Sequence, residues 1–351
     1  CMLVGTPMLQ GCMDNSLNDP LGKVSEEELG RDGFAANAFF LTLCDYAYPI
    51  ATENIYNTNE SLIGDCYGRY QVMATDKFKG ANFATYNAPE NWLNWQFADD
   101  NVMVLTYGAW NKIKNVTQGT GVNFAWAQIL RIATMHRMLD MYGALPYSQI
   151  SSDKLSAPYD TMEEAYHAMF TDLTDAINVM TVYVTENPNN RTMAKYDKVY
   201  DGDFEKWVKF ANSLKLRMAI RIRFADREYA RQMAEEAINH SIGVITSNED
   251  NATSLGTKNQ LYTVLVQWPD QCVSADITSY MKGYNDPRMS KYFKKKTSDK
   301  GDDDYVGMRA GLSYGNDITG PTFSRINVGE MDRTLWMSAA ETAFNLSLIH
   351  I

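Results

Sequence analysis

The sequence predicts a mainly α-helical protein, and three segments with helical periodicity carry that prediction. Across residues 203–224 the apolar side chains recur every three or four positions, as Phe204, Trp207, Val208, Ala211, Leu214, Met218 and Ile222. This spacing places them on one wide face of a helix. Residues 161–181 repeat the pattern, and residues 123–142 are apolar on nearly every side. We therefore expect these helices to form the core, with 203–224 at its centre.

The remaining segments give a mixture of helices and loops. Residues 32–52 carry Phe and Leu at helical spacing and predict a first core helix. Residues 53–100 mix Asn, Gly, Thr, Asp and aromatics without a period, which predicts long structured loops with, at most, short strands. Residues 101–116 and 226–241 predict two further helices. Residues 261–268 alternate in side-chain character and predict a short strand at best.

Capping residues support several helix ends. Asp203 can accept hydrogen bonds from the first turn of its helix, and Thr161 with Glu164 forms a capping box. Gly143 suits the end of the helix before it. Neighbouring helices resemble tetratricopeptide-type pairs without a regular 34-residue repeat, namely 123–142 with 161–181, and 203–224 with 226–241.

Composition excludes several classes of protein. The 351 residues carry a net charge of -11, which argues against binding nucleic acid. No run of 18 apolar residues predicts a transmembrane helix, so attachment to a membrane would need a lipid anchor. The five cysteines include no pair two residues apart and the four histidines are scattered, so there is no zinc signature.

Six segments together indicate a family. In chain order they are MYGALPYSQI (141–150), YDTMEEAYHAMFTDLTDAI (159–177), GDFEKWVKFANSLKLRMAIRI (202–222), GVITSNEDNA (243–252), YNDPRMSKYF (284–293) and LWMSAAETAF (335–344). This series resembles the SusD/RagB-like outer-membrane lipoproteins, which capture nutrients at the bacterial cell surface. The resemblance implies a SusD-like helical fold with long irregular loops. It also implies a partner, a TonB-dependent outer-membrane transporter of the SusC type.

Both ends of the sequence carry signs of processing. Leu9-Gln10-Gly11-Cys12 resembles a lipobox, which makes Cys12 the candidate for lipidation; the alternative is a stray buried cysteine. We accordingly interpret residues 1–11 as the remnant of a signal peptide and 12–31 as a lipidated tether. Residues 32–345 would be the nutrient-binding domain, which in the family continues further. Residues 346–351, LSLIHI, are typical of a sequencing-adapter scar.

The candidate ligand-binding residues come from a segment dense in aromatics and amides. Tyr86, Asn91 and Trp92 lie in it, and sugars offer flat C–H faces for aromatic rings and hydroxyls for amides. Trp268 and Tyr305 are additional candidates. The alternative is that Trp92 and Trp95, three residues apart, form one buried helix face, and Trp95 and Trp110 are expected in the core.

Signals for a metal or for catalysis are weak. The acidic run at 298–304 could hold calcium but lacks EF-hand spacing, which favours a solvated loop. We find no serine elbow, no phosphate-binding glycine loop and no useful Cys/His pairing. The 43 acidic residues place some carboxylates together in any fold. No catalytic residue, metal or cofactor is predicted.

The sequence therefore predicts a lipid-anchored, surface-exposed protein that captures a nutrient, preferably a glycan or oligosaccharide, without altering it. The ligand would then pass to a SusC-like transporter. Two alternatives stay open: a glycoside hydrolase on a helical scaffold, and a helical scaffold for protein–protein interaction. A peptide ligand also stays open, because parts of the family serve other nutrients.

Overall fold

The computed structural model describes residues 34–75, 83–97, 101–150, 156–268, 270–296, 304–312 and 323–350. Seven helices of at least twelve residues lie in this part of the chain. They are α2 (Phe34–Ala47), α5 (Val102–Thr117), α6 (Gly121–Tyr142), α7 (Met162–Glu186), α8 (Phe204–Ile222), α9 (Arg227–Ile238) and α13 (Ala339–His350). The mainly α-helical class is confirmed.

Shorter elements connect these helices. The short α-helices are α3 (Glu53–Tyr56), α4 (Glu90–Asn94), α10 (Gln260–Tyr262), α11 (Ala275–Gly283) and α12 (Met289–Tyr292). The described residues also contain two π-helices, η2 (Asn57–Asp65) and η7 (Thr263–Gln267), and the 3₁₀ turns η3 (Phe83–Thr85), η4 (Trp95–Phe97), η5 (Ala194–Tyr196) and η6 (Asn248–Asp250). Within the described part of the chain, six strands form three antiparallel pairs: β1 (Gln71–Met73) with β3 (Gln271–Val273), β2 (Ala252–Ser254) with β6 (Thr334–Met337), and β4 (Phe293–Lys294) with β5 (Arg325–Ile326).

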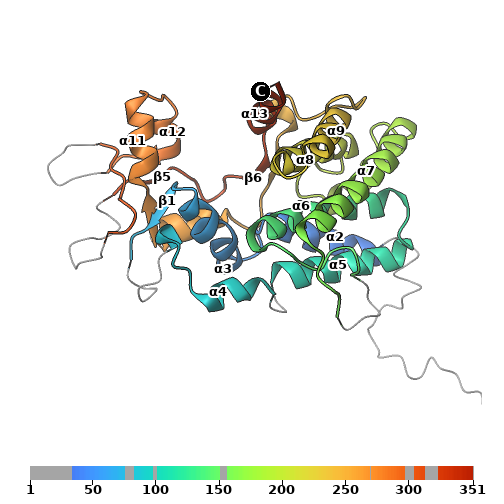
Figure 1. The fold of residues 1–351 in the computed structure, drawn as a ribbon, viewed down its shortest axis with the longest axis horizontal. Helices are drawn as coiled ribbons and strands as arrows, with labels where there is room; N and C mark the ends of the chain where they lie inside the picture. Colours follow the sequence, from blue (N-terminus) through green and yellow to red (C-terminus); the bar gives the residue numbers. More distant parts are fainter. Residues whose placement is uncertain are drawn as a thin grey trace, which may run out of the picture.

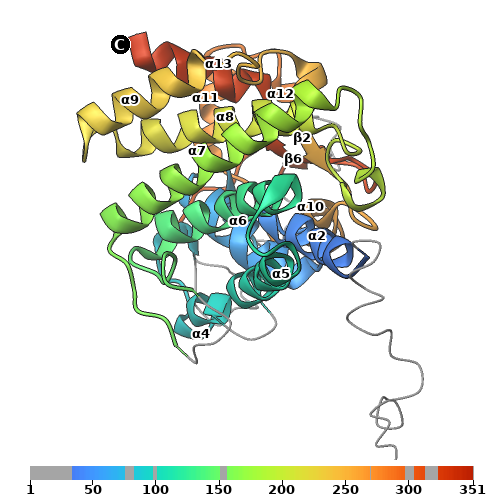
Figure 2. The same cartoon turned by 90° about the vertical axis from the view of Figure 1, so that its right-hand side faces the viewer.

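The long helices and the short elements gather on different sides of the molecule (Figure 1). Helices α2 and α5–α9 pack on one side, and α11 and α12 lie with β1 and β5 on the other. The predicted pairs are confirmed, since α6 packs against α7 and α8 against α9. Figure 2, turned by 90°, shows these helices running past one another in layers, with α13 lying over α8.

Trp207 occupies the centre of the core. Its indole is fully buried, and its Nε1 donates to the Asp197 carboxylate at 2.7 Å. The same carboxylate accepts from the backbone N–H groups of Val199, Tyr200 and Gly202. Four rings surround the indole at centroid distances of 5.3–6.2 Å, those of Trp126, Tyr200, Phe210 and Trp336. The predicted central position of this helix is confirmed.

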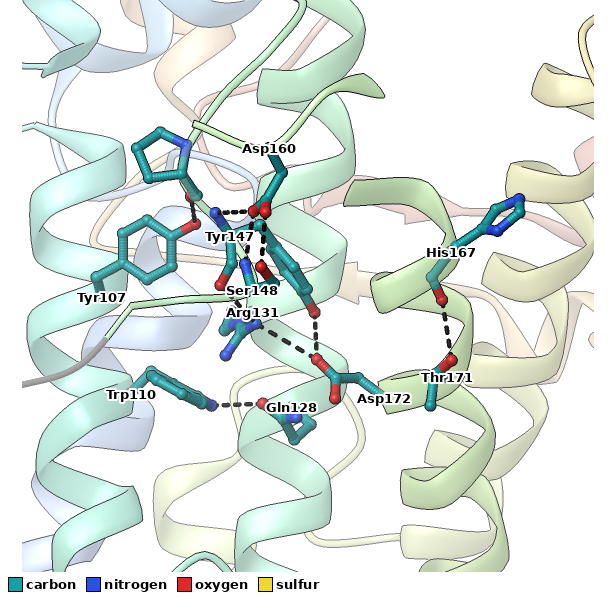
Figure 3. Close-up of polar contacts among 11 residues, drawn as sticks. Tyr107, Trp110, Gln128, Arg131, Tyr147, Ser148, Asp160, His167, Thr171 and Asp172 are labelled. Atoms are coloured by element: carbon teal, nitrogen blue, oxygen red, sulfur yellow. Dashed lines mark hydrogen bonds and ion pairs between the residues drawn. The ribbon is translucent and has the colours of Figure 1, made fainter. Parts of the chain in front are cut away.

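The turn after α6 is fastened by a buried arginine (Figure 3). The Arg131 guanidinium lies 4.0 Å from the ring centroids of both Trp110 and Tyr147, and it pairs with Asp172 at 3.4 Å. The Tyr147 hydroxyl donates to the same Asp172 carboxylate at 2.8 Å. The backbone N–H of Tyr147 donates to Asp160. The segment MYGALPYSQI (141–150), one of the six that resemble the family, is therefore anchored to α6 and α7.

Two expectations need correction. Residues 261–268 are helical and do not form a strand, because Asn259 caps α10 and the following π-helix buries Val264 and Leu265. Residues 53–100 contain α3, η2 and α4 as well as loops. The apolar periodicity that predicts a helix is absent there, because polar side chains occupy buried helical positions. They donate to backbone carbonyls one turn earlier: Thr58 to Asn54, Asn59 to Ile55 and Ser61 to Asn57.

We expect Trp207→Ala to lower the free energy of unfolding by about 3–5 kcal/mol, because it empties a large buried volume and leaves Asp197 short of a donor. Urea denaturation checks this value. Trp268→Ala is the matched control, since Trp268 is partly exposed and should cost far less. A loss under about 1 kcal/mol for Trp207→Ala would contradict its central position.

Candidate functional site

The site begins with the pairing of two short strands from distant parts of the chain. Gln71 of β1 lies opposite Val273 of β3 in an antiparallel register. The residues just before β1 therefore lie beside those just after β3. The backbone N–H of Ser274 donates to the carbonyl of Tyr70 at 3.0 Å, and Arg69 approaches Asp276 at 3.8 Å. This pairing brings together residues about 200 positions apart.

Helix α11 then directs tyrosines toward that junction. Ser274 caps the helix by accepting from the N–H of Asp276 at 3.1 Å. Tyr280 and Tyr284 are four residues apart, so they share one side of the helix, and their ring centroids lie 5.2 Å apart. Met281, on the adjacent side of the helix, joins a small apolar cluster with Val273, Met289 and Phe293. The buried face fixes the helix, and its tyrosine face stays in solvent.

These elements enclose a cavity of about 770 Å³, which we call the tyrosine pocket. Four phenol rings line it and remain exposed: Tyr70 at 54%, Tyr280 at 69%, Tyr284 at 74% and Tyr292 at 46%. The polar side chains that line it are Arg69, Asp276, Asp286 and Arg288. A second hollow of about 670 Å³ shares Arg69, Asp276, Tyr280 and Tyr284. Tyr280 and Tyr284 thus stand between two hollows.

Charge pairing holds the polar side chains of the tyrosine pocket in place. Arg288 donates from Nε to Asp286 at 2.9 Å and from Nη2 at 2.5 Å. The hydrogen bonds from the Arg288 side chain, and then from its backbone N–H, lower the pKa of Asp286 to about 2. The same pairing raises the pKa of Arg288. Both groups therefore stay charged across the physiological range and act as fixed hydrogen-bonding groups.

Two of the predicted ligand residues lie next to the tyrosine pocket. Tyr86 is 63% exposed, its ring centroid lies 5.1 Å from that of Tyr67, and the Arg69 guanidinium is 6.0 Å from its ring centre. Tyr86 is therefore joined to the pocket through Arg69. Tyr305 is half-buried against the cluster beneath α11, and the Lys295 ammonium lies 5.8 Å from its ring centre. It supports the pocket from below.

The other predicted residues lie elsewhere. Asn91 and Trp92 belong to α4. The centroid of the Trp92 ring lies 5.8 Å from that of Phe83. Trp92 also lines a separate cavity together with Trp95. Trp95 is only partly buried, whereas Trp110 is buried as expected. Trp268 ends η7 and is partly exposed. Cys12, the tether and most of the acidic run at 298–304 lie outside the described residues.

The described residues offer no metal site of the usual kind. No group of three His, Cys, Asp or Glu side chains within them could hold an ion. Asp304, the described end of the acidic run, pairs instead with Lys282 at 2.6 Å. Within the same part of the chain, every helix is too short or too polar to cross a bilayer. Residues 346–350, which the sequence marked as a scar, continue α13, and Leu346 packs against the main core.

With the geometry established, comparison with known proteins identifies the family. The profile of the SusD-like family, described as "Susd and RagB outer membrane lipoprotein", matches residues 16–347. The chain belongs to the SusD-like family. This confirms the family assignment made from the six sequence segments. No curated protein matches the chain.

Several solved SusD-like structures share the fold. A SusD homologue from Bacteroides uniformis is 36% identical with a TM-score of 0.81, over 89% of this chain and 65% of that one. A SusD-like protein from Bacteroides thetaiotaomicron is 32% identical with a TM-score of 0.78, over 88% and 64%. A chitin-binding SusD homologue from Flavobacterium johnsoniae gives the same four values. The chain thus spans just under two thirds of the length of these relatives.

Sequence reasoning missed the residues that make the tyrosine pocket. Tyr280 and Tyr284 are four residues apart, which would have placed them on one face of a helix. That signal was present in the sequence. Tyr292 lies on a separate helix, α12, beyond Pro287. The spacing of the tyrosines could not show that Arg69 and Tyr70 lie beside them, because the β1–β3 pairing brings that turn to α11.

Proposed function

We infer that this SusD-like protein captures a glycan at the cell surface through the tyrosine pocket. The observation that carries the proposal is the set of four exposed tyrosines around one cavity, with two arginines and two aspartates between them. Phenol rings cover the C–H faces of sugar rings, while carboxylates and guanidinium groups bond to the hydroxyls. A cavity of about 770 Å³ accommodates a short stretch of an oligosaccharide.

Family membership supports the wider role. Its family is described as outer-membrane lipoproteins, so we place the protein at the outer membrane with a lipid on Cys12. Delivery of the bound nutrient to a SusC-like TonB-dependent transporter follows from the same family resemblance. The Flavobacterium johnsoniae homologue is described as chitin-binding, which makes chitin oligosaccharides the first ligands to test.

One carboxylate of the tyrosine pocket, Asp286, is unsuited to the acid role in the hydrolase alternative. Glycoside hydrolysis needs a carboxylic acid that still holds its proton near neutral pH. Asp286 is held ionised by Arg288 and its pKa falls to about 2, so it cannot serve as that acid. We propose binding without chemistry because a homologue of 32% identity is described as chitin-binding. A helical protein-interaction scaffold would not need four tyrosines around a cavity of this size.

We expect Tyr280→Ala and Tyr284→Ala each to weaken glycan binding by about 1 kcal/mol, or about five-fold in Kd, because each removes one stacking surface. Isothermal titration calorimetry with chitin, starch, xylan and pectin oligosaccharides measures this. Tyr159→Ala is the matched control, since Tyr159 is similarly exposed on the segment before α7. The melting temperature should barely change, because the rings lie in solvent.

Two outcomes would contradict the proposal. Equal affinity of the wild type and the Tyr280→Ala, Tyr284→Ala double variant for every bound glycan would remove the tyrosine pocket as the site. Release of reducing ends by the wild type during binding, lost in Asp276→Asn, would instead establish a hydrolase.

We expect Cys12→Ala, made in the precursor with an intact signal peptide and expressed in a host that processes lipoproteins, to release the protein from the membrane fraction. The reason is that a lipid on this residue would be the anchor. Fractionation and intact-mass spectrometry measure the change, with Cys44→Ala as control because Cys44 is buried. A wild-type protein that remains membrane-bound without an acyl chain would rule the anchor out.

A further inference from the structure

A second cavity, lined by different side chains, lies away from the tyrosine pocket. Its volume is about 440 Å³, and the side chains that line it are Asn54, Asn57, Thr58, Trp92 and Trp95. We call it the indole pocket. Helix α4, which carries Trp92, lies at the lower edge of the molecule in Figure 1, whereas α11 and α12 lie at the upper left. The two pockets are therefore separate surfaces.

The two indoles of this pocket differ from those of the core. Trp110, Trp126, Trp207 and Trp336 are at most 3% exposed. Three of them also donate their indole N–H inside the protein, to Gln128, Asp197 and Ser254. Trp92 and Trp95 are only partly buried, and both reach the cavity. One side of Trp92 packs against the apolar cluster that contains Phe83, and the remaining surface of Trp92 and Trp95 is reached by solvent.

The polar wall of the indole pocket is held in a fixed orientation. Asn57 and Thr58 begin the π-helix η2, and Asn54 lies three and four residues before them, on the same side. The Ser61 hydroxyl donates to the Asn57 side-chain carbonyl at 2.6 Å, which sets the direction of that amide. The Thr58 hydroxyl donates to the carbonyl of Asn54 at 3.1 Å. Asn57 and Thr58 are only 5% and 2% exposed, so the exposed Asn54 is the polar side chain that a ligand can reach.

The chemistry of the indole pocket selects an uncharged ligand. None of the five residues that line it is charged, in contrast to the two arginines and two aspartates of the tyrosine pocket. Indole rings cover the C–H face of a sugar, and amides with a hydroxyl bond its rim. A volume of about 440 Å³ lies within the ~300–1,000 Å³ typical of small-molecule sites.

We propose that the indole pocket is a second carbohydrate subsite, which binds a neutral sugar ring independently of the tyrosine pocket. The proposal rests on the proposed function in so far as the ligand is a glycan. A polysaccharide that reaches both subsites would be held at two points, which raises its overall affinity without any new contact.

The two pockets carry different fluorophores, and this makes the test selective. No tryptophan lines the tyrosine pocket, so a ligand-induced change in tryptophan emission that persists in Trp268→Phe and is lost in Trp95→Ala reports on the indole pocket. The probes are five uncharged trisaccharides: triacetylchitotriose, maltotriose, cellotriose, xylotriose and mannotriose. We expect at least one to change the emission saturably, both in the wild type and in the Tyr280→Ala, Tyr284→Ala double variant. The same response should persist in Trp268→Phe, the matched control, because Trp268 is partly exposed at the end of η7.

Variants of the pocket itself complete the test. Kd should rise about ten-fold in Trp92→Ala and about three-fold in Asn54→Ala. Trp92 also contacts Phe83, so its replacement can disturb folding. The variants Asn54→Ala and Trp95→Ala then decide whether the indole pocket binds the sugar, because Asn54 is exposed and Trp95 is partly buried. The proposal is overturned if no trisaccharide changes the emission, or if Asn54→Ala and Trp95→Ala bind as the wild type does.

The two proposals fail in different ways. If the tyrosine double variant abolishes glycan binding and the tryptophan emission never responds, the indole subsite is wrong and the proposed function stands. If the double variant binds normally while Trp95→Ala and Asn54→Ala lose binding, the tyrosine pocket is wrong and the indole pocket is the glycan site.

Discussion

The buried pairing of Trp207 with Asp197 is the interaction on which the helical body depends. A carboxylate 3% exposed is costly unless its oxygens are fully hydrogen-bonded, and Asp197 accepts from three backbone N–H groups and the indole. This arrangement fixes the turn that leads into α8. The indole then orients the surrounding rings from α6, α8 and β6. Helix α8 can pack in only one rotation about its axis.

The rigid body matters for function because the site is built from short elements that could not hold their own shape. Strands β1 and β3 are three residues each, and α11 has nine. An isolated pair of such strands is marginal in water. Here the side chain of Gln271, next to Cys272 in β3, donates to the carbonyl of Ser61 in the middle of η2. The strand pair is thus attached to η2. This attachment fixes the positions of Arg69 and Tyr70, which directly precede β1.

The sequence was sufficient where the periodicity was strong and local. The stripe around Trp207, the capping box at Thr161 and the apolar helix at 123–142 all appear as predicted. It failed where polar side chains bond to their own backbone, as in η2. For the site, local composition predicted Tyr86, which lies beside Arg69 of the tyrosine pocket. Tyr280 and Tyr284 were missed because their importance depends on a strand pairing across about 200 residues, which no local pattern encodes.

Exposed aromatic rings in this protein are informative because the core already contains so many buried ones. The sequence contains seven tryptophans and 21 tyrosines, and several of these rings are exposed while others are buried in the core. The pocket tyrosines remain in solvent on a helix whose other face is packed, and the Arg288–Asp286 pair is already made without a ligand. Groups held in place before binding lose little conformational freedom when a ligand arrives. The exposed rings bury little surface and so contribute little to the fold, which agrees with the proposal that they stack on a flat, hydroxyl-rich ligand.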